Sequence, residues 1–155
     1  MVLLLPLALI GGCRPSSPDS AEEQVGCGIL TPKLAREAVG QKVASRRTKT
    51  GCMLTDPADG RNHLTIVVGE TVDAESFMRR RCTGGWVYAG TPAYYQPACI
   101  TRTANRQTTV MVSDWDGLKV QVELGRNPET MRDDAEQILD ISRDVAAHVN
   151  DSPAG

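Results

Sequence analysis

Residues 108–124 read TTVMVSDWDGLKVQVEL, and this stretch predicts a β-hairpin. Asp116-Gly117 lies at its centre and is a strong signal for a two-residue turn, because Asp and Gly tolerate the positive φ angles that such turns need. Apolar side chains recur on both sides of the turn, as in strands that bury one face. These apolar residues are Val110, Val112, Leu118, Val120, Val122 and Leu124. The hairpin therefore indicates an antiparallel sheet with a half-buried face.

Further strands surround this hairpin. The segments rich in β-branched residues and bounded by turn residues are 52–55, 62–69, 94–101 and 107–113. Residues 41–50 carry four cations and no acid, and we interpret them as a basic loop or a strand edge.

Three helices are expected between and after the strands. Thr31-Pro32 and Gly40 bound the first, and Asp73 is the expected N-cap of the second at 72–81. The last begins at Asn127-Pro128; its apolar stripe, with Ser142 as a polar break, is Met131, Ala135, Ile138, Val145 and Val149. The order of elements predicts an α+β fold, in which an antiparallel sheet is covered on one face by helices and the C-terminal helix packs on the sheet.

Composition limits the class of protein. A chain of 155 residues is long enough for one domain with a core and too short for two. The net charge of −2 and the aromatic content of 4% argue against a nucleic-acid partner, which would need a basic surface or stacking platforms.

The N-terminus predicts export and lipid attachment. Residues 1–12, MVLLLPLALIGG, have the apolar run of a signal peptide and are too short to span a membrane. Ile10-Gly11-Gly12-Cys13 resembles a bacterial lipobox, so Cys13 is the expected site of diacylglycerol and fatty-acid (palmitate) attachment. The alternative is an ordinary cleaved signal with a chance cysteine, and the absence of a preceding cation leaves open a start further upstream.

The remaining chain divides by composition. Residues 13–25 form a lipidated cysteine and a tether rich in Pro, Ser and acids, 26–150 form a single domain, and 151–155 are a frayed tail. These features predict a protein anchored at the outer face of the cytoplasmic membrane.

Four more cysteines lie in the domain. An even number in an exported domain favours disulfides, and four cysteines allow three connectivities. We favour the sequential pairs Cys27–Cys52 and Cys82–Cys99, since each closes a short loop between adjacent elements. The alternative is a four-thiolate zinc site, although no Cys-x-x-Cys motif is present.

Residues 27–32 strengthen this picture through a resemblance. Cys27-Gly28-Ile29-Leu30-Thr31-Pro32 resembles the opening Cys-x-Leu-Leu-Thr-Pro of a family of small actinobacterial lipoproteins of unknown function. LAREAVG at 34–40 and Ala93-Tyr94 also match features of that family, whereas Cys52-Met53-Leu54 lacks its usual aromatic residue. The resemblance implies the first disulfide and an exported, anchored domain, and it implies no activity.

Catalytic motifs are scarce. The sequence has no paired metal-ligand spacing, nucleophile elbow or phosphate-binding loop, so we expect neither a cofactor nor a metal. His148 lies near the C-terminus of the last expected helix, where the helix dipole alone accounts for a histidine. The alternative function is an envelope hydrolase that would use His63, Asp114 or Asp116 as its acid–base groups.

Two sets of residues are candidate binding surfaces. The basic set is Lys42, Arg46, Arg47 and Lys49, joined by Arg79–Arg81 if the fold brings them close; its alternative is a solvated face. The aromatic set is Trp86, Tyr88, Tyr94 and Tyr95, and its alternative is core packing near Cys82–Cys99.

The expected function is therefore a non-enzymatic binding or accessory module. Its partners would be the membrane, through the N-terminal lipid, and an envelope protein or a small apolar ligand. A regulatory lipoprotein that restrains a membrane sensor is a further alternative.

Overall fold

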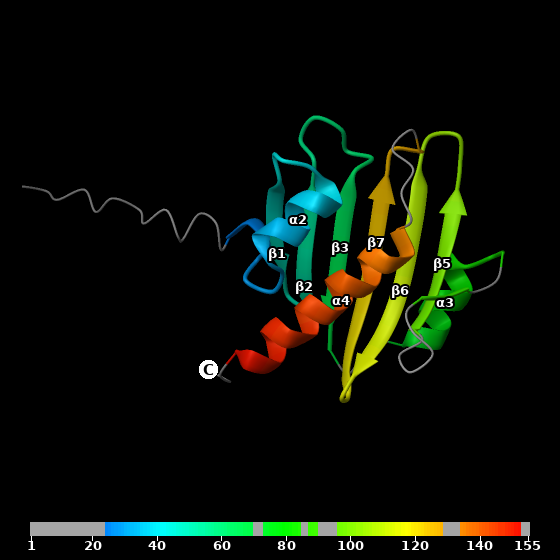
Figure 1. Cartoon of the computed structure of the whole chain (residues 1–155). Coiled ribbons are helices and arrows are strands. Elements are labelled where there is room, and N and C mark those ends of the chain that lie inside the picture. The colour runs from blue at the N-terminus through cyan, green and yellow to red at the C-terminus, as the bar shows by residue number, and fades with distance from the viewer. Residues whose placement is uncertain (1–23, 70–72, 85–86, 90–95, 129–133, 153–155) are drawn as a thin grey trace, which may run out of the picture.

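The computed structural model describes residues 24–69, 73–84, 87–89, 96–128 and 134–152. Within these residues, seven strands form one antiparallel sheet in the order β1-β2-β3-β7-β6-β5-β4, and three helices pack against it (Figure 1). The strands are β1 (Ala44–Thr48), β2 (Gly51–Thr55), β3 (His63–Val68), β4 (Val87–Ala89), β5 (Gln96–Arg102), β6 (Gln107–Trp115) and β7 (Leu118–Arg126). The helices are α2 (Pro32–Val39), α3 (Ala74–Arg81) and α4 (Asp134–Asp151). The predicted α+β class, with a C-terminal helix on an antiparallel sheet, is confirmed.

The hairpin of β6 and β7 forms the middle of the sheet. Asp116 and Gly117 connect the strands with φ angles of 54° and 89°, the left-handed conformations that a tight hairpin turn needs. Asp114 supports the turn, because its Oδ1 accepts a hydrogen bond of 2.8 Å from the Gly117 amide. The predicted turn is therefore confirmed.

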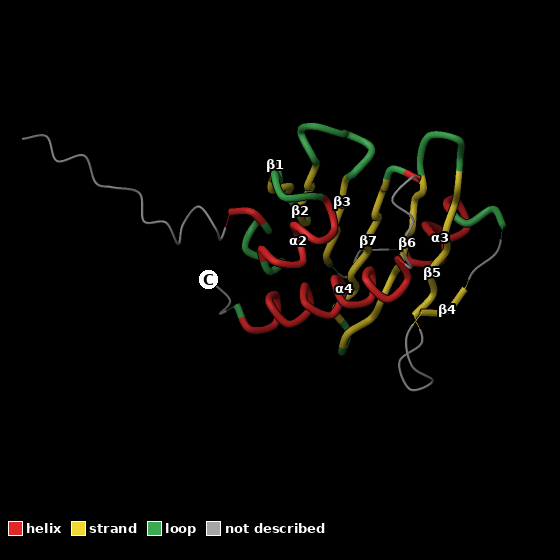
Figure 2. The backbone as a smooth tube through the Cα atoms, turned by 45° about the horizontal axis from the view of Figure 1, so that its top comes forward, coloured by secondary structure: helices red, strands yellow, loops and turns green. Residues whose placement is uncertain are grey.

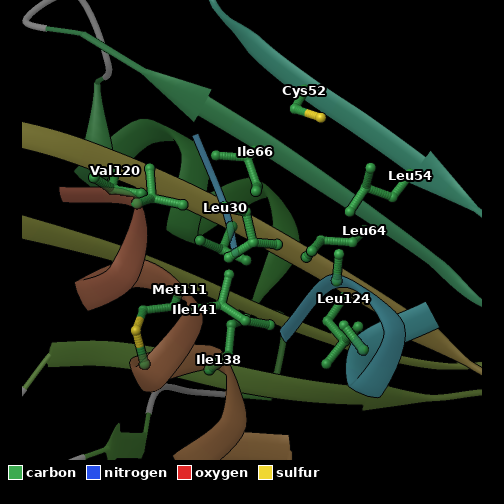
Figure 3. Close-up of a cluster of buried hydrophobic side chains, with 14 of the residues drawn as sticks. Leu30, Cys52, Leu54, Leu64, Ile66, Met111, Val120, Leu124, Ile138 and Ile141 are labelled. Atoms are coloured by element: carbon green, nitrogen blue, oxygen red, sulfur yellow. The ribbon is translucent and has the colours of Figure 1, made fainter. Parts of the chain in front are cut away.

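The larger core lies on the face of the sheet that α2 and α4 cover, hereafter the α2/α4 face (Figures 1 and 2). Ile138 and Val145 of the predicted apolar stripe of α4 are fully buried there, together with Ile141, which the stripe did not include. Figure 3 shows how side chains from the helices and the sheet meet in this core; the fully buried sheet residues are Cys52, Leu54, Leu64, Ile66, Ala98, Met111, Val120, Val122 and Leu124.

A smaller core lies on the opposite face, hereafter the α3 face. Phe77 and Met78 of α3 pack there with Val110 and Val112 of β6. The prediction placed helices on one face of the sheet. The structure has α2 and α4 on that face and α3 on the opposite one. The physical reason lies in β6, where Val110-Met111-Val112 is apolar at consecutive positions and therefore needs cover on both faces.

Some element boundaries differ from the expectation. The basic segment includes an edge strand, β1, which pairs with β2 alone. Asp73 caps α3 as predicted, since its Oδ1 accepts a bond of 3.0 Å from the Ser76 amide. The helix α4 is described from Asp134 on, and residues 129–133, which include Met131 of the predicted stripe, lie outside the described residues.

Both predicted disulfides are present. Cys27–Cys52 links the segment before α2 to β2, and Cys82–Cys99 links the end of α3 to β5. The zinc alternative is wrong for these four cysteines, because all four sulfurs form S–S bonds. Cys27 and Cys52 lie in the larger core and Cys82 and Cys99 in the smaller one, so each face of the sheet has its own cross-link.

Candidate functional sites

The predicted aromatic surface lies mostly outside the described residues. Trp86, Tyr94 and Tyr95 are not described, and only the backbone of Tyr88 is, in β4 opposite Pro97. This surface stays a prediction.

The three acid–base candidates do not come together. His63 opposes Gly125 near the end of β7, whereas Asp114 opposes Lys119 at its beginning. Asp116 lies in the turn beyond. Nearly the whole length of β7 therefore separates His63 from the two aspartates.

The structure instead brings His63 to Glu123 and Arg81 on the α3 face. His63 Nε2 lies 3.8 Å from Glu123 Oε1, and Arg81 at the end of α3 reaches Glu123 Oε2 at 3.1 Å. The His63 and Glu123 side chains are only 17% and 18% exposed. Gly125 makes room for His63, because a Cβ at that position would overlap the imidazole ring.

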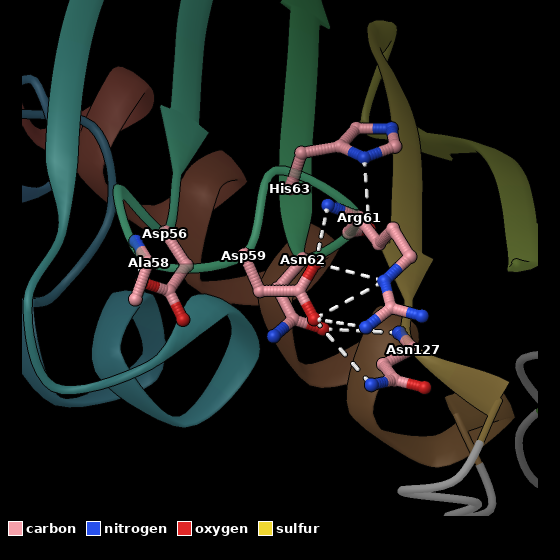
Figure 4. Close-up of polar contacts among 7 residues, drawn as sticks. All are labelled: Asp56, Ala58, Asp59, Arg61, Asn62, His63 and Asn127. Carbon is pink, nitrogen blue, oxygen red and sulfur yellow. Dashed lines mark hydrogen bonds and ion pairs between the residues drawn. The ribbon is translucent and has the colours of Figure 1, made fainter. Parts of the chain in front are cut away.

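Both ring nitrogens of His63 have an oxygen atom as neighbour. Nδ1 lies 3.2 Å from the Arg61 carbonyl oxygen, an acceptor, and Nε2 faces the Glu123 carboxylate (Figure 4 shows the first contact). The His63 imidazole, and then the Arg81 charge, hold the pKa of Glu123 below its usual range, against the opposing effect of burial. The cluster therefore favours the charged form of the Glu123 carboxylate.

A polar hollow of about 320 Å³ lies near this cluster. Thr101, Thr108, Gly125 and His63 are paired in one row across β5, β6, β7 and β3, so the hollow and the imidazole share the α3 face. The residues that line the hollow are Arg61, Thr101, Thr103, Asn105, Arg106 and Thr108. Hydroxyl, amide and guanidinium groups suit a polar or anionic partner.

Arg61 lies at the edge of this hollow, and Asp59 in the same turn holds its guanidinium in place. Its guanidinium forms two bonds to Asp59, from Nε to Oδ1 at 2.9 Å and from Nη2 to Oδ2 at 2.7 Å (Figure 4). These bonds lower the pKa of Asp59 to about 2. Asn127 joins the turn at residues 59–62 to the end of β7, because its backbone N–H donates a hydrogen bond of 3.0 Å to Asn62 Oδ1.

The basic hairpin, defined as Lys42, Arg46, Arg47 and Lys49, forms one edge of the sheet. All four residues are exposed. Arg79–Arg81 do not join them, because these arginines end α3, which packs on β5 and β6 beyond β2, β3 and β7. A groove of about 210 Å³ runs beside the hairpin; it is lined by Ile29, Arg47, Thr48, Lys49, Thr50, Gly51, Val68 and Val149.

A buried ion pair was missed by the sequence reasoning. Arg126 Nε lies 2.7 Å from Asp134 Oδ1, with the side chains 8% and 0% exposed. Gln107 donates to Asp134 Oδ2 at 2.9 Å, and Arg126 also donates to Gln137 Oε1. From the sequence, Asp134 is explained by the positive end of the last helix alone. The one signal of a buried pair is Arg126, a charged residue at the end of the apolar strand β7.

Ser142, the polar break in the apolar stripe, is also explained. It is fully buried, shares a hydrogen bond with Ser113, and accepts one of 2.8 Å from Trp115 Nε1. His148 lies in the last turn of α4, where Nδ1 is 2.8 Å from the Asp144 carbonyl oxygen.

No protein-family description and no curated protein sequence matches the chain. Among the described residues, no group of three His, Cys, Asp or Glu side chains is placed to hold a metal ion. Nor does any helix in that part of the chain have the length and apolar character to cross a membrane.

Proposed function

We propose that this chain is an exported lipoprotein, acylated at Cys13 and held at the outer face of the cytoplasmic membrane. The observation that carries the proposal is the pair of disulfides, Cys27–Cys52 and Cys82–Cys99, one on each face of the sheet. Such cross-links form and persist in oxidising compartments outside the cytoplasm. The lipobox at residues 10–13 and the tether after it supply the anchor.

The domain on this anchor is a binding module for an envelope protein. The hollow beside Arg61 and Arg106 is lined by residues with hydroxyl, amide and charged groups, which can form hydrogen bonds to a protein surface. A membrane sensor that the module restrains is one form of such a partner. In-cell crosslinking tests this proposal: we expect a membrane or envelope protein to be trapped, and capture of none would contradict it.

A small apolar ligand is the second candidate, favoured by the concentration of Trp86, Tyr88, Tyr94 and Tyr95 in one segment. Native mass spectrometry of protein recovered from its own host separates the two. A bare mass is expected for a protein-binding module, whereas extra mass that is lost on denaturation would assign a carrier function.

The anchor has a direct genetic test. Cys13→Ser removes the only thiol that the lipobox offers, so the variant should leave the membrane fraction or accumulate as unprocessed precursor. The matched control is Ser16→Ala in the tether, which should fractionate as the parent protein does. A Cys13→Ser variant that still carries lipid would contradict the proposal.

A further inference from the structure

The basic hairpin stands out among the surfaces of the domain for its uncompensated charge. Residues 41–50 contain four cations and no acid, and all four cations are exposed. Two other exposed arginines of the described chain have acidic partners close by: Arg79 pairs with Glu75, and Arg143 with Asp140. No ion pair links the basic hairpin to an acid among the residues that the structure describes.

The hairpin lies where the tether joins the domain. Ser45 in β1 donates a hydrogen bond of 2.5 Å to the Val25 carbonyl oxygen, at the end of the tether segment. Only residues 14–24 separate this point from Cys13, a span of at most about 40 Å when fully extended. A lipid at Cys13 therefore keeps the basic hairpin within reach of the membrane surface.

The groove beside the hairpin adds apolar groups to the charges. Ile29, Val68 and Val149 line it and are only partly buried, next to Arg47 and Lys49. Apolar side chains that are flanked by cations are typical of surfaces that settle into the headgroup region of a membrane.

We propose that the basic hairpin docks the domain on anionic phospholipid headgroups. The proposal rests on the lipid anchor only for its orientation, since the charges and the groove belong to the folded domain. Each Lys or Arg near an anionic surface raises the partitioning about fivefold, and the effect is screened by salt. Four cations beside a fixed anchor would hold the free edge of the sheet at β1 against the membrane, with Arg47 on the α2/α4 face and Arg46 on the other. The hollow at the far end of the α3 face would stay free for a protein partner.

Vesicle flotation of the mature chain from residue 13, carrying Cys13→Ser, tests the docking without the anchor. We expect the chain to float with vesicles that contain phosphatidylglycerol, to stay behind with phosphatidylcholine alone, and to detach at high salt. Lys42→Glu/Lys49→Glu should lower the partitioning at least about tenfold. Arg79→Glu/Arg80→Glu is the matched control, because it makes the same change in net charge at the far end of the sheet; its effect should stay within about threefold.

Three results would overturn the proposal. One is a parent chain that does not float with anionic vesicles, and another is an equal loss in both double variants. The third is flotation that appears only after Asp19, Glu22 and Glu23 are replaced by Asn and Gln. That result would mean that the cations of the basic hairpin bind the acidic tether instead of the phospholipid headgroups. Failure of the anchor proposal is a different result, which the flotation assay does not measure: protein from the host would then carry no acyl mass on Cys13.

Discussion

The buried ion pair between Arg126 and Asp134 is the interaction whose loss we expect to destabilise the fold most. It joins the end of β7 to the start of α4, and Asp134 is fully buried. Asp134→Asn keeps the size of the side chain but leaves the Arg126 guanidinium buried without a carboxylate. Breaking a buried pair in this way costs about 3–5 kcal/mol. We expect a loss of about 3 kcal/mol in the free energy of unfolding, because the Asn amide oxygen can still accept from Gln107.

Urea unfolding with both disulfides intact, followed by circular dichroism, measures this loss. Asp140→Asn on the same helix is the matched control: Asp140 pairs with Arg143 at 3.2 Å, but the two side chains are 58% and 56% exposed. An exposed pair contributes about 0–1 kcal/mol, so the control should unfold almost as the parent does. Arg126→Met/Asp134→Leu removes both charges and should recover most of the lost stability.

The losses in stability of Asp134→Asn and Asp140→Asn decide whether the buried ion pair stabilises the fold. If Asp134→Asn costs no more than Asp140→Asn, the pair does not anchor α4 and the energetic reasoning is refuted. If the double variant is less stable than Asp134→Asn alone, the cost comes from lost hydrogen bonds rather than from an uncompensated charge.

Three further predictions concern the α3 face and the interior. His63→Gln should raise the pKa of Glu123 toward its usual value of 4.5, measured by NMR titration; no change would contradict the contact. Because folding lowers this pKa, the stability that Glu123 contributes is present above about pH 4.5 and is lost as the pH falls below it; parent and His63→Gln stabilities should therefore converge in acid. Gly125→Ala should displace the imidazole and raise the same pKa, whereas an unchanged titration would show that the ring is not seated over Gly125. Ser142→Ala should cost about 1 kcal/mol in urea unfolding, since Trp115 Nε1 loses one of its two acceptors; a gain in stability would refute that hydrogen-bonded arrangement.

Local signals in the sequence predicted much of the fold. The Asp116-Gly117 turn, the capping role of Asp73 and the apolar stripe of α4 are set by neighbouring residues, so they can be recognised without tertiary information. The sequential disulfides could also be predicted from the sequence, because each joins elements that follow each other closely along the chain.

The parts that were missed depend on residues far apart in the sequence. His63 and Glu123 meet only because β3 pairs with β7, and nothing near either residue indicates that pairing. Arg126 and Asp134 were hidden for another reason, since acids at helix starts are usually solvated. The second helix-covered face was signalled by Val110-Met111-Val112, but a short apolar run does not say what covers each side.

The central claim, that this is an exported and lipid-anchored protein, is tested most directly by one measurement. Protein extracted from host membranes is digested, and the N-terminal peptide is analysed by mass spectrometry. The account predicts a peptide that begins at Cys13 and carries diacylglycerol with or without a further fatty acid. A free, unmodified Cys13 in an N-terminal peptide that begins elsewhere would contradict it.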